Sequence, residues 1–194
     1  MFNFMDHVIT KVFNPLNVTK TSVMEFNIGE LRDTGLYRFS KIIEFNVGGR
    51  TYTRYLIFSK TENTEYVFEV FPESHTQSET YLYSLADTVP FSEEFLEIVG
   101  QRYFTTPDGD EYERCVMPED EERIDGTQGS IKVYNIETNH VEKQAAVKIW
   151  DYKRETDSVT EFLSVELSEE TGEFRIFTGE IIENIFYKFY QTSK

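Results

Sequence analysis

Two carboxylates occupy matching places in a repeated pattern of this chain, and such a pair could serve as an acid and a base. Glu44 and Asp151 each follow two bulky apolar residues and precede an aromatic one. If the two segments faced each other across a pseudo-two-fold axis, the carboxylates would meet and one would be held protonated. The other interpretation is that both side chains point from strands into water. We favour this solvated interpretation, because charged residues on strands are mostly exposed.

The single cysteine, Cys115, is the other residue with reactive chemistry. Paired with a histidine it could be a nucleophile or part of a zinc site, but His7, His75 and His140 are scattered along the chain. A structural zinc site needs four ligands, usually in closely spaced pairs. No metal and no cofactor is therefore predicted. Cys115 lies beside Val116 in a predicted strand and is expected to be a buried, inert thiol.

Two acidic stretches suggest binding. Asp108-Gly109-Asp110 resembles the start of a calcium loop, but such a loop needs further oxygen ligands and a Gly at its sixth position, where this chain has Glu113. We therefore predict a turn there. The run from Glu119 to Glu122 is interpreted as a solvated loop, with a docking site for a basic partner as the alternative.

The common catalytic and nucleotide-binding signatures are absent from the chain. It contains no G-x-S-x-G, H-E-x-x-H, G-x-G-x-x-G or P-loop motif. The Gly48-Gly49 pair is followed by no P-loop Lys and no helix signal, so it is interpreted as a hairpin turn. These absences lower the expectation of an enzyme without excluding one.

The stretch from Val147 to Gly179 contains Asp151 and the only Trp of the chain, and its pattern is typical of three consecutive strands. Leu163, Val165 and Leu167 share one face at a period of two. The segment from Glu169 to Gly172 then supplies a turn in which Gly can take a positive φ, and the chain returns antiparallel. The unit is a β-meander.

A similar unit recurs earlier in the chain, from Ile42 to Val70, at one constant offset. In this alignment Ile43 falls on Trp150, and Leu56 falls on Leu163. The match predicts an internal duplication. The alternative is a chance similarity between two aromatic-rich meanders.

Short motifs in these two units carry a resemblance to a known family. They are W-x-Y at Trp150 and Tyr152, E-F-L-S-V-E from Glu161 to Glu166, F-x-G-E from Phe177 to Glu180, and G-x-x-Y at Gly49 and Tyr52. On these residues the chain resembles the bacterial DUF4178 family, a domain of unknown function, over roughly Glu30 to Glu183. The resemblance implies a cytoplasmic, bacterial, β-rich domain without an established activity or catalytic residue. It also hints at a role in envelope maintenance.

Short helices are predicted at both ends and near Ser92. Apolar residues recur at helical spacing from Phe4 to Phe13 and from Ile181 to Tyr190, with a β continuation as the alternative for the second segment. Ser92, followed by acidic residues, favours the start of a helix that runs to Val99. The segment from Pro107 to Asp110 predicts a hairpin.

The predicted fold is mainly β and antiparallel, barrel-like or sandwich-like, with two related meander halves and short peripheral helices. Residues 1–29 would form an N-terminal helix and linker, 30–118 the first half, 119–130 an acidic connection, and 131–194 the second half with the C-terminal segment. With 194 residues the chain can bury about 70% of its unfolded surface. Its aromatic content of 15% favours sheets over helical bundles.

The overall charge and the lack of targeting signals limit the partners. A formal net charge of −16 repels phosphate backbones and anionic headgroups, so no nucleic-acid partner is predicted. The chain shows no apolar run of about 20 residues and no signal-peptide pattern, which predicts a cytoplasmic protein without membrane insertion. A single cysteine excludes an intrachain disulfide and fits a reducing compartment.

Together these features predict a non-catalytic binding or scaffold module with a protein partner, acting in a multi-protein system that the resemblance would associate with the envelope. The alternative is an enzyme or small-ligand binder with a site between the two β halves. The residues expected to form the ligand or partner surface are Trp150, Tyr152, Glu161, Glu44 and Asp151. The sequence does not predict the oligomeric state.

Overall fold

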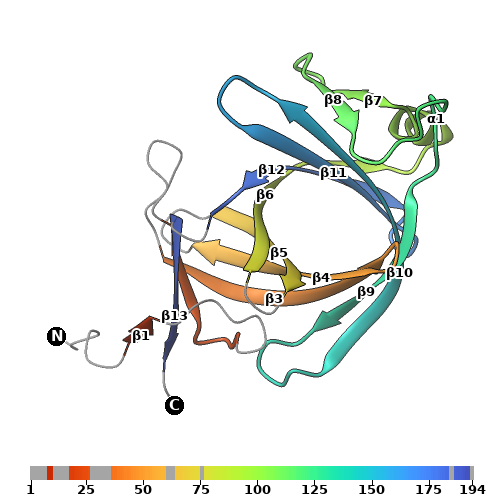
Figure 1. The fold of residues 1–194 in the computed structure, drawn as a ribbon. Coiled ribbons are helices and arrows are strands. Elements are labelled where there is room, and N and C mark those ends of the chain that lie inside the picture. Colours follow the sequence, from red (N-terminus) through yellow and green to blue (C-terminus); the bar gives the residue numbers. More distant parts are fainter. Residues whose placement is uncertain are drawn as a thin grey trace.

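A computed structural model describes residues 8–10, 18–26, 36–59, 64–74, 77–183 and 186–192 of the chain. Two runs of four consecutive strands dominate it (Figure 1). The first meander comprises β3 (Leu36–Val47), β4 (Arg50–Ser59), β5 (Thr64–Ser74) and β6 (Gln77–Pro90). The second comprises β9 (Thr127–Tyr134), β10 (Val141–Glu155), β11 (Thr160–Ser168) and β12 (Glu173–Ile181).

The two meanders join along two seams and close into a barrel. Within each meander every strand pairs antiparallel with the next, and β6 pairs with β12 while β9 pairs with β3. The ring therefore runs β3, β4, β5, β6, β12, β11, β10, β9 and back to β3. The prediction of a mainly β, antiparallel, barrel-like fold is confirmed.

The seam between β9 and β3 depends on a glycine. Gly129 on β9 lies opposite Val47, and a Cβ at Gly129 would lie 2.4 Å from the carbonyl oxygen of Asn46. No side chain fits at that distance, so glycine permits the close approach of the two backbones.

Further strands extend the sheet beyond the ring. The first part of β3 continues into β2 (Val23–Phe26), β13 (Tyr187–Thr192) and β1 (Val8–Thr10). At the other end, β7 (Tyr103–Thr105) and β8 (Glu111–Arg114) form a hairpin that pairs with the end of β10. The helix α1 (Glu93–Val99) lies beside this hairpin (Figure 1).

Local signals in the sequence set the turns and the helix start. The β3–β4 turn contains Gly48 and Gly49 at φ of +58° and +78°, and Gly109 takes +90° at the tip of the β7–β8 hairpin. Such conformations favour glycine. At the start of α1, the Ser92 hydroxyl accepts a hydrogen bond from the Phe95 N–H at 3.1 Å. The predicted turns and the predicted helix after Ser92 are thereby confirmed.

Apolar side chains fill both the inside and the outside of the ring. One inner cluster holds Phe45, Tyr52 and Ile149, and another holds Leu56, Tyr83 and Phe177. On the outside, β10, β11 and β12 pack against α1 and the β7–β8 hairpin through Trp150, Tyr152, Leu163, Phe174 and Phe104. A second outer cluster, which includes Met24, Phe26 and Phe189, covers β3 to β5 with β2 and β13. Much of the ring is therefore buried on both faces.

The predicted helices at the two ends are corrected. Of the two interpretations of the segment from Ile181 to Tyr190, the helix is wrong and the β continuation is confirmed: the segment contains part of β13, which pairs with β2 and buries Phe189. Of the predicted N-terminal helix only Val8–Thr10 lies within the described residues, and these three form β1. Pairing with an open strand satisfies the backbone of each segment, which outweighs the helical spacing of its apolar residues.

The residue-by-residue match between the meanders is also corrected. Ile43 packs with the inner cluster of Phe45 and Ile149, whereas its proposed counterpart Trp150 packs on the outside of the ring with Phe174. A shift of one residue moves every side chain of a strand to the other face. The chain does contain two four-stranded meanders, but the constant offset aligns residues from opposite faces.

Candidate ligand-binding groove

A groove of about 960 Å³ lies on the outside of the ring, between the sheet and the β7–β8 hairpin with α1. Its apolar lining includes Leu82, Val89, Phe95, Ile98, Leu163 and Ile176. These side chains come from four elements, namely β6, α1, β11 and β12. Charged residues line the groove as well, so one ligand could make both apolar and charged contacts there.

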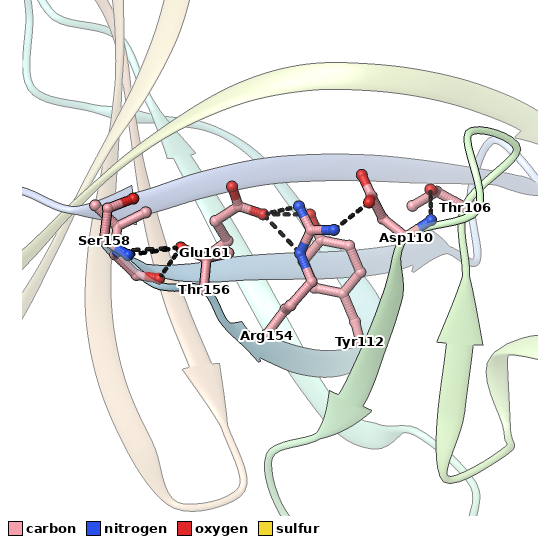
Figure 2. Close-up of polar contacts among 8 residues, drawn as sticks. Thr106, Asp110, Tyr112, Arg154, Thr156, Ser158 and Glu161 are labelled. Carbon is pink, nitrogen blue, oxygen red and sulfur yellow. Dashed lines mark hydrogen bonds and ion pairs between the residues drawn. The ribbon is translucent and has the colours of Figure 1, made fainter.

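Arg154 forms the centre of a polar cluster at one side of the groove. It lies near the end of β10, directly opposite Glu161 at the start of β11. The Glu161 carboxylate oxygen Oε2 accepts hydrogen bonds from Arg154 Nε at 3.0 Å and from Nη2 at 2.5 Å, and Arg154 Nη1 pairs with Asp110 (Figure 2). One guanidinium thus joins a carboxylate of the ring to a carboxylate of the hairpin.

Tyr112 completes this cluster from β8. Its hydroxyl donates a hydrogen bond to Glu161 at 3.1 Å, and the Arg154 guanidinium lies over its ring, 5.1 Å from the centroid. Burial raises the pKa of Tyr112 to about 12, and the nearby Glu161 carboxylate adds to the shift. Tyr112 is therefore a protonated donor at neutral pH. Hydrogen bonds to Glu161 and Asp110 raise the pKa of Arg154. The Arg154 guanidinium is therefore positively charged at neutral pH.

Two turns hold the partners of this cluster in place (Figure 2). In the β10–β11 turn the Thr156 hydroxyl donates to the Val159 carbonyl at 2.7 Å and accepts from the Val159 N–H at 3.0 Å. In the β7–β8 turn the Thr106 hydroxyl accepts from the Asp110 N–H at 3.2 Å. Each turn fixes one side of the cluster: the first sets Arg154 opposite Glu161, and the second presents Asp110.

Acidic side chains outnumber cations along the groove. Among the described residues that line it, the carboxylates are Asp87, Asp108, Asp110, Glu161 and Glu180, and Arg154 is the one cation. Glu161 and Glu180 lie directly opposite each other on β11 and β12. Like charges in that arrangement destabilise a sheet. Arg154 offsets the charge of Glu161, while Glu180 has no ion-pair partner among the described residues.

Only one of the predicted surface residues lines the groove, namely Glu161. Trp150 and Tyr152, expected on a partner surface, are fully buried beneath α1 and the hairpin. The Tyr152 hydroxyl donates to the Val99 carbonyl at 2.5 Å, which ties β10 to the end of α1. These two aromatic residues stabilise the platform on which the groove is built, and neither side chain contributes to an exposed ligand or partner surface.

Glu44 and Asp151 do not form the less favoured acid–base pair; Asp151 is exposed and Glu44 is half-buried, in line with the favoured solvated interpretation. Glu44 pairs with Lys132 of the neighbouring strand β9 at 3.1 Å. Asp151 accepts a hydrogen bond from the Ser164 hydroxyl at 2.8 Å, on the side of β10 that faces the inside of the ring. The two carboxylates lie on opposite faces of the sheet because the alignment that equated them was out of phase.

The inside of the ring holds a second charged cluster. Arg54 on β4 pairs with Glu69 on β5 and with Glu166 on β11, and all three side chains are buried. The guanidinium also lies over the rings of Phe45 at 4.7 Å and Phe177 at 5.4 Å. These partners come from β3, β5, β11 and β12, so Arg54 links the two meanders inside the ring.

This inner cluster was not predicted, although the sequence holds a signal for it. Glu69 stands between Val67 and Phe71 at a period of two, so a charge occupies a position in an otherwise apolar face. Burial raises the pKa of Glu69, and the nearby Arg54 opposes that shift. All three charged side chains are buried, so the cluster contributes to the packing of the ring interior.

The thiol and the acidic loops have limited chemistry. Cys115 is exposed, which corrects the prediction of a buried thiol. Partial desolvation and the Asp151 carboxylate raise the pKa of its thiol to about 11. Cys115 is therefore not a thiolate at neutral pH. The segment Asp108-Gly109-Asp110 forms the predicted turn, and the described residues contain no cluster of three metal-ligating side chains. The run from Glu119 to Glu122 is exposed, as predicted for a solvated loop.

In comparisons with known proteins, no family model matches this chain, and no curated protein and no solved structure matches it. The resemblance to the DUF4178 family therefore stays a prediction. In the part of the chain that the structure describes, the helix is too short and too polar to cross a membrane.

Proposed function

We propose that this protein is a non-catalytic binding module that holds a cationic, partly apolar ligand in the groove beside Arg154. The observation that carries the proposal is the direct opposition of Glu161 and Glu180 on the floor of the groove. A bound cation would offset a like-charge pair that otherwise costs stability.

The rest of the lining supports the same ligand chemistry. Five carboxylates and one guanidinium give the groove a net negative charge, which attracts cations and repels anions. Ile98 and Val159 line the groove and stay partly exposed at 40% and 42%, so an apolar part of the ligand would bury them. A protein segment with a basic side chain and apolar neighbours combines both features, in keeping with the predicted protein partner.

Calorimetric titration with two short peptides tests this proposal. The probes are acetyl-Leu-Lys-Leu-amide and its acidic counterpart, acetyl-Leu-Glu-Leu-amide. We expect the basic peptide to bind and the acidic peptide not to bind. The affinity for the basic peptide should fall as salt rises, because exposed charges are screened.

Two variants locate the binding. Glu180→Gln should weaken binding of the basic peptide by about two- to fivefold, the range for a partly exposed ion pair. Glu169→Gln is the matched control, because Glu169 is an exposed acid in the β11–β12 turn away from the groove lining. Equal binding of both peptides, or equal weakening by both variants, would overturn the proposal.

A further inference from the structure

Arg154 sits in a setting that matches the recognition of an arginine side chain. Two of its nitrogens bond one Glu161 oxygen, a third pairs with Asp110, and its flat face covers the Tyr112 ring. Two carboxylates and an aromatic face suit a planar guanidinium, whose several donors lie in a fixed fork. An ammonium offers no such plane, so the same setting suits lysine less well.

The cluster is also short of positive charge. Asp110, Glu161 and Glu180 supply three carboxylates, and Arg154 supplies the one guanidinium among them. A second guanidinium would still leave this row with a net negative charge. Glu180 lies next to Glu161 across the strand pair, so an incoming cation and Arg154 would compete for the same Glu161 carboxylate.

The hairpin that carries Asp110 and Tyr112 is held to the ring by few backbone bonds. β8 pairs with β10 through only Arg114 and Glu113, at the base of the hairpin. Nearer the tip, the polar contacts from Asp110 and Tyr112 to the ring end on Arg154 and Glu161. Competition for Glu161 would therefore act on the contacts that fix the tip.

We infer that Arg154 is an internal occupant of an arginine subsite, and that the ligand of the groove is an extended segment whose arginine competes with Arg154 for Glu161. This inference rests on the proposed function and narrows it from cations in general to a guanidinium. Removing the Arg154 side-chain charge should vacate the subsite. The binding affinity of arginine ligands should then increase more than that of lysine ligands, because only arginine reproduces the forked set of N–H donors of Arg154.

The experiment compares acetyl-Leu-Arg-Leu-amide with acetyl-Leu-Lys-Leu-amide on wild type, Arg154→Met and Lys143→Met. Lys143→Met is the matched control, because it removes one exposed cation that pairs with Glu170 outside the groove lining. We expect Arg154→Met to bind the arginine peptide about tenfold more tightly, the scale of a charged hydrogen bond. The affinity for the lysine peptide should increase less, and Lys143→Met should leave the affinity for both peptides unchanged.

Three other outcomes are decisive. If Arg154→Met strengthens both peptides equally, the inference fails while the proposed function stands. If the basic peptides bind wild type but Arg154→Met changes neither affinity, Arg154 is purely structural and the inference fails. If no basic peptide binds wild type or Arg154→Met, the proposed function fails as well.

A second variant protects the test against misfolding. Circular dichroism and a thermal melt first establish that Arg154→Met is folded. If it is not, Arg154→Lys replaces it, because lysine keeps the charge and the stem but loses the fork. The affinity for the arginine peptide, relative to wild type, should then still increase more than the affinity for the lysine peptide. An equal change in the two affinities counts against the inference.

Discussion

Arg54 of the first meander and Glu166 of the second pair with each other inside the ring, where they are only 3% and 7% exposed. The pair connects strands β4 and β11, which are not neighbours in the sheet. It therefore joins the two meanders through the interior, in addition to the two seams. A buried charge so placed must be matched, because an unpaired one carries a large desolvation cost.

Replacing Arg54 with methionine should destabilise the protein strongly. Arg54→Met leaves Glu69 and Glu166 buried without their cation, and breaking a buried pair in this way costs about 3–5 kcal/mol. Urea denaturation of wild type and variant measures the loss. Arg50→Met is the control, because Arg50 is exposed at the start of the same strand. A loss below about 1 kcal/mol, the scale of a surface pair, would contradict the described pairing.

The free energy of unfolding should depend on pH through the titration of Glu69. Burial raises the pKa of Glu69 above its ordinary value, so the folded protein binds this proton more tightly than the unfolded chain. The stabilising contribution of that proton is complete below the unfolded pKa, about 4.3, and is lost as pH rises through the folded pKa.

Glu69→Gln isolates this effect, because the amide does not ionise and still accepts a hydrogen bond from Arg54. The free energy of unfolding of the variant, minus that of wild type, should therefore rise with pH from about 4 upward. Urea denaturation at several pH values measures this difference. A difference that stays flat, or falls, across that range would show that Glu69 has no raised pKa.

The stability of the protein should also depend on the titration of Tyr112, a groove residue, at alkaline pH. The pKa of Tyr112 is raised to about 12 by burial and by Glu161, so the stability that this tyrosine contributes is complete below about pH 10. That contribution is lost as pH rises from about 10 through about 12. The advantage of wild type over Tyr112→Phe should shrink over this interval.

Two measurements check the Tyr112 prediction. Tyrosinate absorbance, compared between wild type and Tyr112→Phe, gives the titration of this one residue. Denaturation across the same pH range gives the stability difference. Tyr103→Phe is the control, because Tyr103 is 47% exposed at the edge strand of the same hairpin. If Tyr112 titrates near the ordinary value for tyrosine, about 10, Glu161 does not hold the Tyr112 proton.

Local features were predictable from the sequence, because they depend on a few adjacent residues. The Gly48-Gly49 turn, the hairpin at Gly109 and the helix after Ser92 all follow from backbone preferences and capping. The class of fold followed from aromatic content and alternation. Closure of the ring did not, because the pairing of β9 with β3 joins segments far apart in the chain.

The candidate site was only partly predictable. Glu161 was identified, but its partners Asp110 and Tyr112 come from a separate hairpin, and only the fold brings them to Arg154. Trp150 was predicted to belong to a ligand or partner surface, because the sequence of β10 does not show whether a side chain points to the inside or the outside of the ring. Where both faces of a strand are apolar, alternation does not distinguish inside from outside.

Closure of the ring has a consequence for the order of folding. Each meander forms from hairpins between consecutive strands, but both seams join distant segments and therefore carry a large loop-closure cost. The β3–β9 seam is the shorter of the two, with six paired positions against nine for the β6–β12 seam. We expect the seam at Gly129 to form late, so that a transient open intermediate exposes the free edges of β3 and β9. A substitution at Gly129 would prolong that state, and aggregation during refolding would then compete with the final closing step.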